Sequence, residues 1–337
     1  MPRQLASEHP RSGPDLPIAD YALISDCHSA ALVSSHGSID WACLRRFDSG
    51  STFARLLDHD RGGFFSILPV APVTRVSRRY VGATMVLETT METDGGAIVL
   101  TDAFAMHAGG SGSPRGQLLR RVEAISGTVE VDVLIEPRFD YGSVHPWLQV
   151  DSDGRTSAVG GEDALAIHAT EPLQIDQPAA RLSCRCVVTP DRPFAVTVVS
   201  QPAHLLARRA ADAADVEGRL RETVDWWTKW SSTTTPDGVY SRHVERSALV
   251  LKALCCAPTG AVIAAPTTSL PEIPGGGANW DYRFCWIRDA TLTLEALSAV
   301  GHAEVAQGFR DFIMRSSAGR GDELQIMYGT YGERRLP

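Results

Sequence analysis

The order of extended segments followed by helical ones constrains this fold most. Up to about residue 199 the sequence consists of short apolar runs separated by turn residues such as Asp94-Gly95-Gly96. Runs at such short intervals, with no helical period between them, predict an antiparallel β-sandwich rather than alternating βαβ units. The expected strands cover residues 30–33, 38–41, 64–68, 84–91, 97–100, 117–125, 128–135, 181–188 and 194–199.

The pattern becomes helical from about residue 203. Leu206 to Trp230 is rich in Ala, Arg, Glu and Leu, which predicts a long helix that ends before the polar run 231–238. Its three tryptophans are expected to pack between domains. Further helices are expected at 244–255, 290–300 and 303–315. We therefore predict a disordered tail (1–16), a sandwich domain (17–202), a linker helix and loop (203–238) and a helical domain (239–337).

Composition limits the possible partners. The 337 residues carry a net charge of -8, from 32 basic and 40 acidic residues without long charged blocks, which argues against a nucleic-acid surface. No apolar run reaches membrane-spanning length and no secretory signal is visible, so a cytoplasmic protein without a membrane partner is expected. The seven cysteines form no zinc pattern; we expect reduced, mostly buried thiols, no metal and no cofactor. Composition leaves the oligomeric state open.

The segment from Asn279 to Asp289 concentrates the chemistry of the chain. It contains two indoles, a phenol, two guanidiniums and two carboxylates, and it follows a loop rich in Pro and Gly. We expect it to lead into a helix with Asp289 near the N-terminus, where a carboxylate is favoured. Aromatic faces beside Arg and Asp groups suit a sugar, whose hydroxyls accept directional charge-assisted bonds. An Arg–Asp pair that only pins the loop explains the composition equally well.

Three stretches together resemble glycoside hydrolase family 15, which contains glucoamylases, glucodextranases and bacterial trehalases. The first runs from Ala264 to Glu272, and the second from Asn279 to Asp289. The third, near the amino terminus, runs from Asp26 to Ser49 and is similar to the start of the bacterial two-domain members. The resemblance covers nearly the whole chain from about Pro17. It implies a β-sandwich followed by an (α/α)6 toroid.

The same resemblance implies inverting hydrolysis of an α-glucoside by two glutamates. Both lie in later parts of the toroid, and residues 239–337 have room for only about three or four helices. The expectation is therefore a chain that stops part-way through its second domain, and we assign no catalytic residue. The residues that the resemblance implies in the pocket for the terminal glucose are Tyr282, Trp286, Arg288 and Asp289, with Trp280, Asp281 and Arg283 as possible supporting residues behind them. Residues 323–329 are a candidate rim.

Two functional hypotheses follow. The first is an α-glucoside hydrolase acting on malto- or isomalto-oligosaccharides or on trehalose. The second is a non-catalytic chain that keeps only part of the glucose-binding pocket. A stand-alone β-sandwich binding module is disfavoured, because helical segments follow Tyr240.

Overall fold

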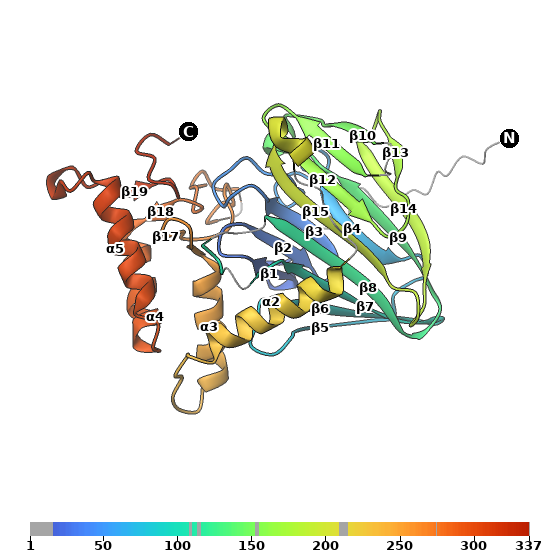
Figure 1. The fold of residues 1–337 in the computed structure, drawn as a ribbon, viewed down its shortest axis with the longest axis horizontal. Coiled ribbons are helices and arrows are strands. Elements are labelled where there is room, and N and C mark those ends of the chain that lie inside the picture. Colours follow the sequence, from blue (N-terminus) through green and yellow to red (C-terminus); the bar gives the residue numbers. More distant parts are fainter. Residues whose placement is uncertain are drawn as a thin grey trace.

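The computed structural model describes residues 16–107, 110–112, 116–151, 155–208, 215–273 and 275–336. Most of the predicted tail, residues 1–15, lies outside them. Figure 1 shows two layers of strands packed face to face, with the helices gathered on one side. No helix among the described residues is long and apolar enough to cross a membrane.

The first sheet has seven antiparallel strands and the second has eight. In spatial order, the first contains β1 (Tyr21–Ser25), β2 (Ala30–Ser34), β3 (Ser38–Cys43), β4 (Phe64–Pro69), β9 (Val129–Glu136), β14 (Arg181–Val188) and β13 (Gln174–Asp176). The second contains β10 (Trp147–Val150), β11 (Thr156–Gly160), β12 (Asp163–Ala169), β15 (Phe194–Pro202), β8 (Gln117–Gly127), β7 (Gly96–Phe104), β6 (Leu87–Thr93) and β5 (Arg75–Tyr80). The predicted antiparallel sandwich is confirmed.

The core of the sandwich lies between the two sheets. Along β9 the buried residues are Val129, Val131, Val133 and Ile135, so every second side chain faces the other sheet. One ion pair of the second sheet lies in this core. Arg120, from β8, bonds Asp102 at 2.7 Å and also donates to the Gly37 carbonyl of the first sheet at 2.7 Å. Both side chains are fully buried, and the bonds that Arg120 donates to the Gly37 and Phe65 carbonyls link the two sheets.

The helices are α1 (Phe139–Gly142), α2 (Val216–Ser231), α3 (Ser241–Ala253), α4 (Ile287–Ala299) and α5 (Glu304–Ser316), with short 3-10 turns at Ile18–Asp20, Ala203–Arg208 and Gly321–Glu323. Part of the helix predicted from Leu206, residues 209–214, lies outside the described residues; α2 begins at Val216, where Asp215 caps it by accepting from the Gly218 N–H. The helix predicted over 244–255 ends at Ala253, and Cys255 lies instead in β16 (Cys255–Cys256), which pairs with β17 (Ala261–Val262).

Tryptophans join the sandwich to the helices, as predicted. Trp227, on α2, is fully buried in a cluster that includes Met85 of the sandwich and Leu249 of α3. Trp230 stacks on His302 at 4.0 Å between ring centroids. Across the same junction the Trp41 indole donates to the Pro266 carbonyl at 2.6 Å. These contacts hold the helical segments against the sheets.

Candidate functional site

The predicted sugar-binding segment crosses three local structures. Residues 270–273 and 275–280 are mostly exposed loop. Two residues, Cys285–Trp286, form β18, which pairs with β19 (Met327–Tyr328) in a short antiparallel ladder. Helix α4 then begins at Ile287, whose N–H donates to the Ile326 carbonyl. The ladder and the start of α4 therefore form one continuous unit, and the candidate rim 323–329 supplies its second strand.

Arg283 and Asp281 form a tight ion pair at the base of the segment. The guanidinium approaches the carboxylate with Nε to Oδ1 at 3.0 Å and Nη2 to Oδ2 at 2.7 Å. Its Nη1 donates to the Ser49 carbonyl of the sandwich at 2.6 Å. Burial alone would lower the pKa of Arg283, but the bond to Asp281 and the electrostatic attraction of neighbouring groups together outweigh burial, and the pKa is raised. Arg283 is 3 % exposed, so this pair holds the loop against the sandwich.

Two aromatic rings lie above that pair. The Tyr282 and Trp286 ring centroids are 6.2 Å apart with an interplanar angle of 35°. The Trp286 indole donates to the Asp281 carbonyl at 3.1 Å, and the Tyr282 hydroxyl donates to Glu272 at 3.2 Å. Both residues are partly exposed. Trp280 is more exposed, at 54 %.

Arg288 and Asp289 lie in the first turn of α4, where the helix dipole favours an anion. Arg288 Nη2 is 3.3 Å from Asp289 Oδ2, and the two side chains are 78 % and 36 % exposed. The geometry of this contact is not that of a hydrogen bond. Among the described residues, Asp289 Oδ2 is shielded from solvent and has no hydrogen-bond partner. Unlike Asp281, this carboxylate therefore has one oxygen without a hydrogen bond.

The structure thus separates the predicted residues into two groups. Tyr282, Trp286, Arg288 and Asp289 present accessible groups at the start of α4, whereas Asp281 and Arg283 are bonded to each other.

Sequence reasoning did not find the bond between Tyr282 and Glu272, or the bond between Asp48 and Thr330 directly after the ladder. Both contacts depend on how a loop folds, so no periodic pattern in the sequence predicts them.

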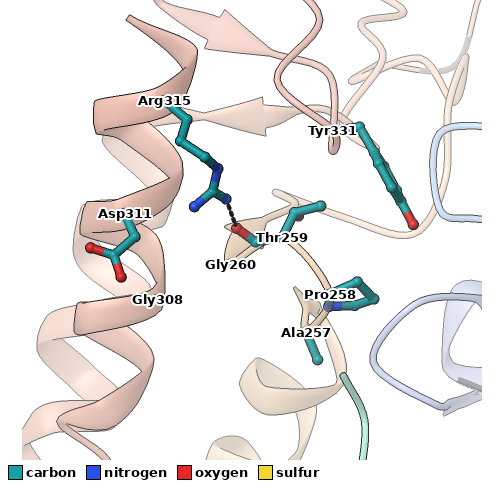
Figure 2. Close-up of a pocket in the computed structure, with 8 residues that line it drawn as sticks. All are labelled: Ala257, Pro258, Thr259, Gly260, Gly308, Asp311, Arg315 and Tyr331. Atoms are coloured by element: carbon teal, nitrogen blue, oxygen red, sulfur yellow. Dashed lines mark hydrogen bonds between the residues drawn. The ribbon is translucent and has the colours of Figure 1, made fainter. Parts of the chain in front are cut away.

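A separate surface hollow of about 490 Å³ lies between α5 and the turn at 257–260. Figure 2 shows Arg315 and Asp311 of α5 on one side and the Tyr331 ring on the other. Arg315 donates to the Thr259 carbonyl at 2.6 Å. The residues that line this hollow include none of the predicted sugar-binding residues.

Chemically, the start of α4 can recognise a neutral polyol. A guanidinium supplies donors in a fixed plane, a partly exposed carboxylate supplies acceptors, and the two rings offer apolar surface for C–H groups. The arrangement can orient a sugar ring. Bond cleavage would need a further acid and base, which we assign to no residue of this chain.

Comparison with known families agrees with this chemistry. Residues 12–217 match the family "Trehalase-like, N-terminal", and residues 238–336 match "Glycosyl hydrolases family 15". Trehalase from Mycolicibacterium smegmatis is 35% identical, and the match covers 95% of this chain and 51% of that protein. Trehalase from Mycobacterium tuberculosis is 34% identical, over 99% of this chain and 52% of that protein. The chain spans about half the length of these relatives.

Among solved structures, a bacterial glucoamylase complexed with acarbose has a similar fold. Its TM-score is 0.67 at 13% identity, over 96% of this chain and 54% of that one. At this identity the likeness shows the fold alone, and it supports a sandwich followed by the first helices of an α/α toroid. The chain belongs to glycosyl hydrolase family 15, and its amino-terminal domain is of the trehalase-like type.

Proposed function

We propose that this chain carries the pocket for the terminal glucose of an inverting α-glucoside hydrolase, and that trehalose is the α-glucoside. The observation that carries the proposal is the first turn of α4, where the shielded Asp289 Oδ2 lacks a hydrogen-bond partner beside the exposed Arg288 fork. The trehalase names of the relatives support trehalose over malto- or isomalto-oligosaccharides.

Each pocket residue has a distinct role in this proposal. Arg288 and Asp289 hold vicinal hydroxyls, because a planar donor fork and a carboxylate acceptor fix the orientation of the sugar. Trp286 and Tyr282 cover the C–H face. The ion pair of Asp281 and Arg283 holds the loop against the sandwich. We further propose that residues 17–202, 203–238 and 239–337 act as sandwich, linker and helical domains, and that the seven free cysteines suit the cytoplasm.

Calorimetric titration with trehalose and with maltose tests the binding role. The chain is expected to bind trehalose more tightly, and Asp289→Ala to weaken that binding roughly 10- to 100-fold, since a hydrogen bond to a charged group contributes about 1.5–3 kcal/mol. Asp322→Ala is the matched control, because Asp322 is an exposed carboxylate that also lies beside an arginine, Arg320. Equal losses in both variants would contradict the proposed pocket.

The second candidate is a non-catalytic chain that retains only this part of the pocket. It is favoured by the lack of an assignable acid and base among residues 239–337. Glucose release from trehalose, measured beside the Asp289→Ala variant, separates the two. Sugar binding without release supports the non-catalytic chain, while release that Asp289→Ala abolishes supports the hydrolase.

A further inference from the structure

Loop 44–50 of the sandwich contacts the β18–β19 ladder at a buried carboxylate. This loop follows β3, and the Asp48 side chain within it is 2 % exposed. Its Oδ2 accepts from the Thr330 N–H at 2.8 Å, and its Oδ1 accepts from the Thr330 hydroxyl at 2.8 Å. Arg46 Nε lies 2.9 Å from the same carboxylate and balances its charge. Thr330 is itself fully buried, so water cannot replace these bonds.

The same loop holds the other strand of the ladder. The Ser49 carbonyl accepts from Arg283 Nη1 at 2.6 Å, and Arg283 lies two residues before β18. Thr330 lies two residues after β19. Because the strands are antiparallel, with Cys285 opposite Tyr328, both contacts fall at the same end of the ladder. Asp48 and Ser49 therefore bind the two strands side by side.

The opposite end of the ladder leads to Arg288 and Asp289. There the Ile287 N–H donates to the Ile326 carbonyl, and α4 begins with Arg288 and Asp289 in its first turn. A two-residue ladder is short, so a shift at the end held by Asp48 moves the start of α4 as well. Phe47, next to Asp48, is buried in the apolar cluster of the helices and fixes the loop on that side.

We propose that Asp48 is a positioning residue for the sugar site, through which the sandwich domain sets the placement of Arg288 and Asp289. This inference rests on the proposed function and adds a role for the sandwich in it. Asp48 touches no sugar; it acts through Thr330, β19 and β18. If the ladder shifts at the end held by Asp48, Arg288 and Asp289 stay in the site but are no longer aligned with the hydroxyls of the sugar.

Two variants and one matched control test the inference. Asp48→Asn removes the charge, and Thr330→Val removes one donor while it keeps the shape and the backbone bond. Asp102→Asn is the control, since Asp102 is an equally buried carboxylate bonded to an arginine, in the sandwich core. All three are expected to melt at lower temperature. Only the first two are expected to weaken trehalose binding, by roughly 10-fold.

A second readout keeps this test independent of the proposed function. The Trp286 indole N–H, which donates to the Asp281 carbonyl, reports the position of the ladder without any sugar. In ¹H–¹⁵N spectra its resonance should shift and its hydrogen exchange should accelerate in Asp48→Asn but not in Asp102→Asn. Absence of trehalose and maltose binding by the unaltered chain would overturn the proposed function. An unchanged Trp286 resonance, or unchanged sugar affinity in Asp48→Asn, would overturn the role of Asp48.

Discussion

Replacing Arg283 by methionine should destabilise the junction between sandwich and helices strongly. The residue is 3 % exposed, and its guanidinium donates to Asp281, to the Ser49 carbonyl and to the Cys43 sulfur. Its guanidinium carbon also lies 5.5 Å from the Tyr141 ring centroid and 5.9 Å from that of Trp41. Methionine preserves most of the apolar contact with these rings but removes every polar contact.

The magnitude follows from what the substitution leaves behind. Removing one partner of a buried ion pair costs about 3–5 kcal/mol, because the other charge stays buried without compensation. The Asp281 side chain is 23 % exposed, so water compensates part of this and the lower end, about 3 kcal/mol, applies. Arg283→Lys keeps the charge but loses the planar fork, and roughly half of that loss is expected.

Thermal unfolding at a fixed scan rate measures the effect. For a domain of this size class, about 3 kcal/mol corresponds to a melting temperature lower by roughly 6–12 °C. Arg221→Met is the matched control, since Arg221 pairs with Glu217 on α2 with both side chains 69% exposed. An exposed pair contributes less than about 1 kcal/mol. If Arg283→Met lowers the melting temperature no more than Arg221→Met does, the reasoning about the buried contact is wrong.

Three further predictions concern other parts of the chain. Burial raises the pKa of Asp26, so the ionised carboxylate destabilises the folded state. Asp26→Asn should therefore raise the melting temperature at neutral pH. The difference in melting temperature between Asp26→Asn and the unaltered chain should shrink as the pH falls through the raised pKa. An advantage that grew on acidification would contradict this. Gly260→Ala should lower the free energy of unfolding, measured in urea, by about 2–5 kcal/mol, because Gly260 has φ +84° and an added Cβ would lie 2.2 Å from the Gly308 carbonyl oxygen. Gly319→Ala, where an added Cβ meets open space, should lower it by about 1 kcal/mol. Cys186, the half-buried thiol, should react with Ellman's reagent before the buried ones, as peptide mapping would show.

Local patterns predicted much of the fold because burial repeats at the period of each element. The alternation of Val129, Val131 and Val133 is visible in the sequence and marks β9. The spacing of Phe309 and Phe312 marks the buried face of α5 in the same way. Boundaries were less predictable. The start of α2 depends on one capping aspartate, and β16 depends on pairing with β17 after α3 has ended at Ala253.

The sequence by itself determined which groups a sugar site could use. It placed Arg288 and Asp289 together near a helix start and Tyr282 and Trp286 just before them, because neighbours in sequence stay neighbours in space. Only the tertiary structure decided which of the two carboxylates, Asp281 or Asp289, is hydrogen-bonded to an arginine. Arg283, which the sandwich holds, forms an ion pair with Asp281, while one oxygen of Asp289 has no hydrogen bond.

The same distinction applies to the support of the site. Asp48 bonds Thr330 across 282 positions of the chain, and Arg283 bonds Ser49 across 234. Such bonds leave no periodic signal, because neither partner is near the other until the sheets and helices have packed. Residue identity therefore fixed the chemistry of the segment, and the long-range packing of the sandwich against the helices fixed its geometry.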